Sequence, residues 1–345
     1  MGSAASMAAR NEALDAWLKL EAEEDVLEPE LRICDPHHHL WDHSGDKSQF
    51  IVAFVAGGEV ARYPKAYLLP ELLRDVGGGH NVASTVYVQA GSYYRAFGPR
   101  EEAPIGEVEF AQGMAAVADS GCYGPTRACA AIVGSVNLAD RSAEAVLRTM
   151  MKQRNFRGVR VATPELSEDF LAGVALLEKY DLVYEFWDED FATLPTLVEL
   201  AGRFPTVVFV LDHCGGKLGP STDLRDWGAL LGVVAEKCPN VVCKVGGLLG
   251  PKNGFELHAR EAPVGSEELC DLLFPFYAVA IRAFGPSRCM FESNFPVDRM
   301  AASYRVLWNA HKRVCARLEL GPEEKREIFH DVAARTYRLA KDDVS

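Results

Sequence analysis

Eight short apolar segments alternate with eight amphipathic segments along this chain, and this alternation limits the folds available to it. The apolar segments have the length of buried strands, and the amphipathic segments carry apolar residues three or four positions apart, as helices do. Units of this kind predict a parallel sheet with crossover helices, and eight of them predict a single (β/α)8 TIM barrel of the α/β class. The predicted strands are 33–42, 82–89, 129–136, 156–161, 182–187, 206–213, 240–245 and 288–294, and the helices are 70–76, 109–119, 142–151, 167–179, 191–203, 224–237, 266–284 and 300–318.

Two segments flank this alternation. Residues 1–28 form an N-terminal extension, in which apolar residues at helical spacing predict an amphipathic helix over 11–24. Residues 29–345 form the barrel, which ends in a predicted closing helix over 322–339. The start of the chain fits the N-myristoylation pattern at Gly2, but we interpret it as a flexible leader because no polybasic segment follows.

The net charge of −13 and the nine cysteines narrow the functional classes. A nucleic-acid binder is expected to carry a basic patch, and the sequence has none. No apolar run reaches the length of a membrane span, and there is no CxxC pair or secretory signal. We therefore predict a cytoplasmic protein with reduced cysteines that acts on a small-molecule substrate, and we leave homo-oligomeric assembly open.

A histidine-rich motif, Asp35-Pro36-His37-His38-His39, ends the first predicted strand. Alternate residues of a strand point to the same side, so we expect His37 and His39 to face one way and His38 the other. Two imidazoles on one face can bind one metal ion or one polarised carbonyl group. The structural alternative is a surface cluster in which one histidine is packed.

Polar side chains occur near the ends of six further predicted strands. Barrel strands are covered on both faces, so an ionised side chain there is costly unless it is paired or lies at the open end. Together these residues predict a site at the carboxyl ends of the strands. For Glu185, Lys244 and Glu292 taken singly, an ion pair such as Lys244 with Glu185 is an equally good explanation. The residues are Gln89, Arg157, Arg160, Glu185, His213, Lys244, Glu292 and Asn294.

His213 is followed by Cys214-Gly215-Gly216, where glycines allow a sharp turn close to a ligand. We expect its imidazole to meet those of His37 and His39 at one end of the barrel. Long loops over 42–69, 91–106 and 246–265 follow predicted strands and are expected to form a rim there. Tyr94 lies in the second of these loops.

Four motifs together resemble the amidohydrolase superfamily, in particular the branch that contains sugar-lactone lactonases and pyrone-dicarboxylate lactonase. The resemblance covers residues 31–339, nearly the whole chain. It implies a (β/α)8 barrel and hydrolysis at a carbonyl or related centre, with His37, His39 and His213 at the positions of the family histidines and Arg160 at that of a substrate-carboxylate binder. The motifs are Asp35-Pro-His-His-His-Leu-Trp-Asp42, Phe156-Arg-Gly-Val-Arg160, Leu211-Asp-His-Cys-Gly-Gly216 and Phe291-Glu-Ser-Asn-Phe-Pro296.

The sequence departs from the family pattern at two places. Many members carry an aspartate in the last strand that binds metal or acts as a base, and the matching residue here is Asn294, with Asp298 as the nearest substitute. Metal-binding members usually have a further histidine after the fifth strand, where this chain has Phe186-Trp187-Asp188. The cofactor is therefore either absent or one divalent metal, zinc, held by His37, His39 and His213.

These residues predict a hydrolase that opens a small carboxylated lactone or related ester by water addition. Arg160, with Arg157, Gln89 and Tyr94, is expected to hold the substrate. His37, His39 and Lys244, or a zinc ion on the histidines, would stabilise the oxyanion, while Asp298 or His213 takes a proton from water. The alternatives are a metal-dependent non-oxidative decarboxylase of the same superfamily and a non-catalytic metabolite-binding barrel, which Asn294 favours.

Overall fold

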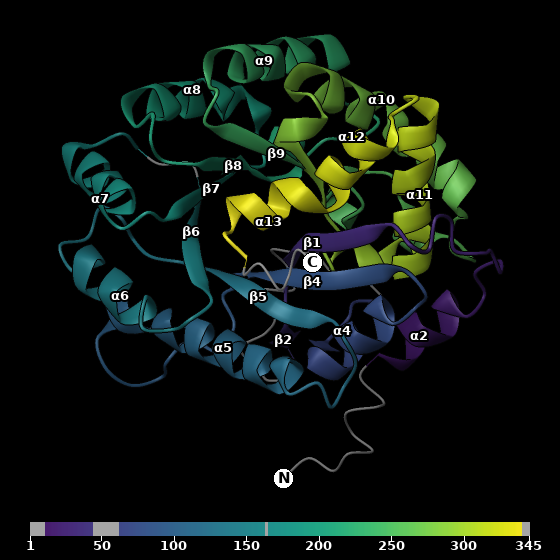
Figure 1. Ribbon diagram of the computed structural model, residues 1–345, viewed down its shortest axis with the longest axis horizontal. Coiled ribbons are helices and arrows are strands. Elements are labelled where there is room, and N and C mark those ends of the chain that lie inside the picture. Colours follow the sequence, from purple (N-terminus) through teal and green to yellow (C-terminus); the bar gives the residue numbers. More distant parts are fainter. Residues whose placement is uncertain (1–10, 44–61, 163–164, 340–345) are drawn as a thin grey trace.

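The computed structural model describes residues 11–43, 62–162 and 165–339, and its centre is a barrel of eight parallel strands (Figure 1). The strands follow one another around the barrel in chain order. Backbone hydrogen bonds close the ring, because His39 N donates to Phe295 O at 2.7 Å and Asn294 N donates to His37 O at 2.9 Å. The predicted (β/α)8 barrel is thus confirmed. The strands are β1 (Arg32–His38), β4 (Asn81–Val88), β5 (Arg127–Gly134), β6 (Phe156–Ala162), β7 (Val183–Trp187), β8 (Phe209–Leu211), β9 (Val241–Val245) and β10 (Cys289–Phe291).

Helices surround the barrel and bury their apolar faces against the strands (Figure 1). Side-chain caps fix the start of several of them, as when Ser167 accepts a hydrogen bond from Phe170 N. The helices are α4 (Leu69–Val76), α5 (Ile105–Asp119), α6 (Ala143–Met150), α7 (Glu168–Lys179), α8 (Leu194–Arg203), α9 (Leu224–Lys237), α10 (Ser266–Phe284) and α11 (Tyr304–Arg317). A two-stranded ladder of β2 (Trp41–Asp42) and β3 (Ala66–Tyr67) flanks the predicted rim loop, of which residues 44–61 lie outside the described part.

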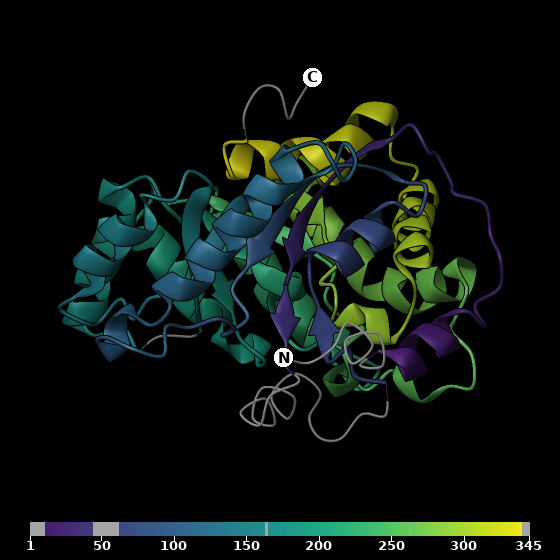
Figure 2. The ribbon, with the colours of Figure 1, turned by 90° about the horizontal axis from the view of Figure 1, so that it is seen from below.

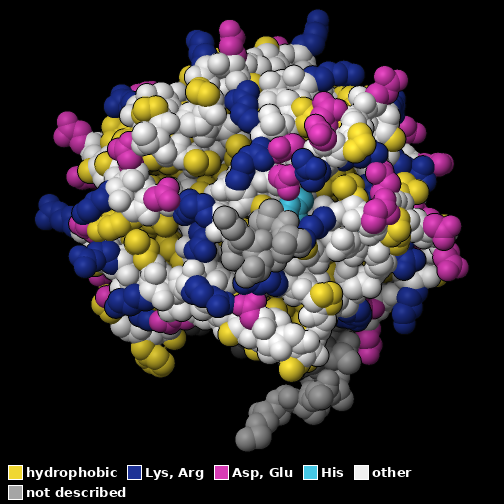
Figure 3. Space-filling model, viewed as in Figure 1, with side chains coloured by type: hydrophobic (Ala, Val, Ile, Leu, Met, Phe, Trp, Pro, Cys, Tyr) yellow, Lys and Arg dark blue, Asp and Glu magenta, His cyan; other side chains and the backbone are white. Residues whose placement is uncertain are grey.

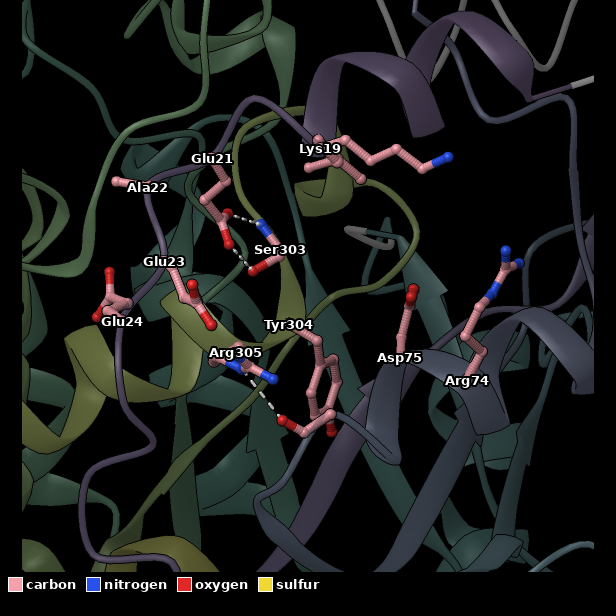
Figure 4. Close-up of a pocket in the computed structure, with 12 residues that line it drawn as sticks. Lys19, Glu21, Ala22, Glu23, Glu24, Arg74, Asp75, Ser303, Tyr304 and Arg305 are labelled. Atoms are coloured by element: carbon pink, nitrogen blue, oxygen red, sulfur yellow. Dashed lines mark hydrogen bonds between the residues drawn. The ribbon is translucent and has the colours of Figure 1, made fainter.

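The N-terminal extension contains α2 (Glu12–Leu18), which is shorter than the predicted helix over 11–24. The acidic residues after α2 do not extend this helix. They accept hydrogen bonds at the starts of two neighbouring helices. Glu21 accepts hydrogen bonds from Ser303 N and Oγ at the start of α11, and Glu24 accepts one from Ser266 N at the start of α10. A pocket of about 330 Å³ lies between this segment, α4 and α11 (Figure 4). The myristoylation pattern at Gly2 lies outside the described residues.

The closing segment consists of α12 (Pro322–Arg326), a π-helical turn (Glu327–Asp331) and α13 (Val332–Thr336). These helices lie across one end of the barrel (Figure 2). Their apolar residues, with Tyr337, pack in one cluster with inward-facing strand residues such as Val86 and Val183. The segment therefore plugs the barrel at the end where the strands begin.

The face that carries the closing helices shows acidic and basic side chains interspersed (Figure 3). All nine cysteines are unpaired, and all except Cys122 are buried. None of the helices in the described ranges combines the length and apolar character that crossing a bilayer requires.

Candidate active site

His37 and His39 face each other at the carboxyl end of β1, as the alternation of a strand predicts. Their Nε2 atoms are 3.3 Å apart, and Nδ1 of His39 is 2.8 Å from the carbonyl oxygen of Val88. His38 points the other way and makes a 2.8 Å hydrogen bond with Oγ1 of Thr85. Burial lowers the pKa of both His37 and His39 well below the usual value, so these rings are neutral.

His213 joins this pair from the turn after β8. The centre of its ring is 4.7 Å from that of His37, so the predicted convergence of the imidazoles is confirmed. The turn requires left-handed backbone at His213 and Cys214, with φ angles of 53° and 56°. Since such backbone is unfavourable for residues with a Cβ atom, the surrounding structure must hold this turn in place.

The carboxylate of Glu292 lies between two of the imidazoles. Its Oε1 is 2.7 Å from Nδ1 of His213, and its Oε2 is 2.9 Å from Nδ1 of His37. Burial alone would lower the pKa of His213, but the negative charge of Glu292 outweighs it and the pKa is raised. Because Nδ1 of His213 faces Glu292, Nε2 is the nitrogen of that ring left for a proton or a cation.

Lys244 is fully buried below the imidazoles. Its Nζ lies 2.8 Å from Oε2 of Glu185, 3.1 Å from Oδ1 of Asp212 and 3.2 Å from Nδ1 of His37. The ion pair with Glu185 is the one that the sequence offered as a structural alternative. Burial would lower the pKa of Lys244, but Asp212 and Glu185 outweigh it and raise that pKa. Lys244 is therefore a fixed positive charge next to His37.

Arg160 completes the cluster at its more open edge, where its side chain is 13% exposed. One guanidinium nitrogen donates to the carbonyl oxygen of Gln89 at 2.6 Å. The other lies 3.3 Å from Nε2 of His37 and 3.6 Å from Oδ2 of Asp212. Gln89 thus contributes its backbone carbonyl to the site, and Tyr94, which is 39% exposed, lies in the loop after Gln89.

The structure does not bring Arg157 to the cluster. This residue lies near the start of β6, and its Nε donates to the carbonyl oxygen of Tyr337 at 2.9 Å in the closing segment. Asn294 and Asp298 bond to each other through Nδ2 and Oδ1 at 2.9 Å. Burial raises the pKa of Asp298 to about 8, and nearby His213 offsets part of this rise.

A divalent cation fits one part of the cluster. Donor atoms of His37, Asp212 and His213 lie within 4.8 Å of one another. Both oxygens of Asp212 are buried and accept no hydrogen bond of normal geometry, although Lys244 is nearby. Two nitrogen ligands of one tetrahedral zinc ion are about 3.3 Å apart, which is also the separation of the His37 and His39 Nε2 atoms. Imidazole and carboxylate donors are those that zinc prefers.

Sequence reasoning placed no carboxylate in the metal set and therefore missed Asp212. A strand that continued through Asp212 and His213 would point these two side chains to opposite faces. Instead β8 ends at Leu211, and a 3₁₀ turn over Asp212–Gly215 brings both side chains to one cluster. The signal that was available is the pair of adjacent potential ligands followed by two glycines.

Comparisons with known proteins identify the family. The sequence pattern of the family "Amidohydrolase" matches residues 34–339. An uncharacterised protein of Sinorhizobium fredii, y4mH, is 30% identical over 334 residues, which cover 90% of this chain and 99% of that protein. The L-fucono-1,5-lactonase of Burkholderia ambifaria is 27% identical over 219 residues, which cover 61% of this chain and 71% of the lactonase. An amidohydrolase of Burkholderia multivorans, solved with bound zinc, superposes with a TM-score of 0.67 and 25% identity over 89% of this chain and 99% of that one.

Proposed function

This chain belongs to the amidohydrolase family and is a hydrolase, and we propose that it opens the ring of a small carboxylated lactone by adding water. The observation that carries the proposal is the cluster at the carboxyl ends of the strands. There Glu292 lies between two imidazoles and accepts a hydrogen bond from His213, while Lys244 and Arg160 supply positive charge around them. Addition of water to an ester carbonyl is favoured by such groups, because negative charge develops on the carbonyl oxygen.

We further propose that His37, Asp212 and His213 hold one divalent metal, zinc, with His39 beside them. When bound, such an ion polarises a carbonyl oxygen and acidifies water. Glu292 fixes the tautomer of His213 by accepting a hydrogen bond from its Nδ1, so that Nε2 of that ring stays available. Lys244 balances the buried charge of Asp212 and Glu185.

We assign Arg160 as the residue that binds the carboxylate of the substrate. Its guanidinium is partly exposed at the edge of the cluster, and its planar fork matches the two oxygens of a carboxylate. The backbone carbonyl of Gln89 holds one of its nitrogens, so the group is oriented before a ligand arrives.

We assign Asp298 as the group that accepts the proton from the attacking water. Its carboxyl group lies near enough to His213 for the charge of that ring to lower its pKa, and Asn294 donates a hydrogen bond to it. A carboxyl group with a pKa of about 8 binds a proton more readily than an exposed aspartate does.

The test is a ring-opening assay on the purified protein with five- and six-membered lactones, with and without a carboxylate, together with metal analysis of the same sample. We expect about one zinc per chain and turnover of at least one carboxylated lactone. Release of carbon dioxide from an aromatic acid without ring opening would instead favour the decarboxylase. Tight binding of a carboxylated lactone with no turnover by zinc-loaded protein would favour the non-catalytic barrel.

A further inference from the structure

Tyr337 follows α13 in the closing segment, and its side chain enters the interior of the barrel. It is fully buried in the cluster that contains inward-facing residues of several strands, among them Val183 and Val210. Its backbone is held as well, because Arg157 donates from Nε to its carbonyl oxygen at 2.9 Å. Arg157, which the sequence suggested for substrate binding, thus fixes the residue that plugs the barrel.

The hydroxyl of Tyr337 donates a hydrogen bond to Oε1 of Glu185. The other oxygen of Glu185 accepts a hydrogen bond from Nζ of Lys244 at 2.8 Å. One carboxylate therefore joins the closing segment to the lysine of the site. All three side chains are buried, so water cannot readily replace a partner that is removed.

Lys244 contacts Glu185 on one side and the residues of the proposed active site on the other. Its Nζ lies 3.1 Å from Oδ1 of Asp212 and 3.2 Å from Nδ1 of His37. The same nitrogen lies 5.8 Å from the centre of the Tyr337 ring, which presents its negatively polarised face to the ammonium group. The phenol therefore constrains Lys244 both through Glu185 and directly through its ring.

We propose that Tyr337 is a positioning residue, which holds Lys244 against Asp212 and His37 by way of Glu185. The closing segment at one end of the barrel then sets the geometry of the groups at the other end. This inference rests on the proposed lactone opening for its kinetic test and on the proposed zinc site for its metal-binding test.

The matched pair of variants is Tyr337→Phe and Tyr184→Phe. Tyr184 is also a fully buried tyrosine on a barrel strand, but its hydroxyl has no hydrogen-bond partner in the described part of the chain. Loss of a partner that directly orients a metal ligand typically costs 10- to 100-fold in activity or affinity, and Tyr337 lies two contacts beyond Lys244, so we take the lower bound. We expect Tyr337→Phe to lower kcat about tenfold with KM within about twofold, and Tyr184→Phe to change neither.

A double-variant cycle separates positioning from general stabilisation. If Tyr337 acts through Glu185, Tyr337→Phe should cause no further loss of kcat in a Glu185→Gln background. Losses that multiply in the double variant would overturn the proposal. So would an unchanged kcat in folded Tyr337→Phe.

Zinc affinity, measured by competition with a chromophoric chelator, is the second readout. We expect Tyr337→Phe to bind zinc about tenfold more weakly than wild type, and Tyr184→Phe to bind it equally well. If Tyr337→Phe does not fold, Arg157→Gln gives the test, since it removes the hydrogen bond to the Tyr337 carbonyl and leaves Glu185 and Lys244 unchanged. Equal zinc affinity in all variants would contradict the inference, whereas a wild-type protein that opens no lactone would contradict only the proposed function.

Discussion

Gly247 lies against the imidazole of His213 so closely that a Cβ atom at this position would be 1.9 Å from Nδ1. That nitrogen is the one that meets Glu292. The backbone of Gly247 also has a positive φ of 68°, which glycine adopts without strain. The loop after β9 therefore forms one wall of the His213 site and tolerates no side chain there.

The Gly247→Ala substitution should consequently displace His213 from Glu292. We expect kcat/KM to fall about 100-fold, because displacements of about 1 Å in an active site have effects of this size. The matched control is Gly254→Ala in the same loop, where φ is also positive at 82° but no atom lies within 4 Å of the new Cβ. Both variants should lose about 1–2 kcal/mol of stability from backbone strain, and only Gly247→Ala should lose activity. Equal activity of the two variants would show that His213 has no role in turnover.

Zinc binding can be tested without any substrate. His213→Asn should weaken zinc affinity more than about 100-fold, since loss of a ligand exceeds the loss of a group that only orients one. His258→Asn is the control, because His258 lies in the loop after β9 outside the cluster. Zinc content per folded chain, measured by atomic absorption after dialysis, checks this expectation. Equal zinc content in both variants would place the metal elsewhere.

Substitution of Arg160 tests the substrate class. Arg160→Lys keeps the positive charge but removes the planar fork that matches a carboxylate. We expect KM for a carboxylated lactone to rise about 10- to 100-fold, as loss of a charge-assisted hydrogen bond predicts, while neutral lactones change much less. Arg203→Lys, an exposed arginine that pairs with Glu199 on α8, is the control for loss of a guanidinium away from the site. Similar losses on both kinds of lactone would mean that Arg160 does not recognise the carboxylate.

The fold could be predicted because the apolar and amphipathic segments repeat with the period of strand and helix throughout the barrel. The convergence of His37, His39 and His213 followed from the rule that parallel strands end at one side of a barrel. Two kinds of contact do not follow from such rules. Arg157 and Arg160 are three residues apart, or about 10 Å along a strand, so one strand places them in different surroundings. The contact of Tyr337 with Glu185 depends on how the closing segment docks, which has no local signal in the sequence.

The last prediction concerns the pH dependence that Asp298 imposes. Burial raises its pKa from 3.8 to about 8, with His213 lowering it in part, whereas the unfolded chain has the ordinary value. The folded state therefore holds a proton that the unfolded state has lost. The stability contributed by this proton is fully present below about pH 4 and is lost as the pH rises through about 8.

Two measurements can test this raised pKa of Asp298, one of stability and one of rate. The midpoint of thermal unfolding should fall less steeply between pH 4 and 8 in Asp298→Asn than in wild type, because the amide does not titrate. If ionised Asp298 accepts the proton from water, wild-type kcat should rise with pH up to about 8, and Asp298→Asn should have a low kcat without this rise. Asp181→Asn, which removes an exposed carboxylate paired with Arg338, should leave both profiles as they are in wild type. A wild-type rate profile in Asp298→Asn would assign the proton to another group, and an unchanged stability profile would mean that Asp298 is ionised in the folded protein.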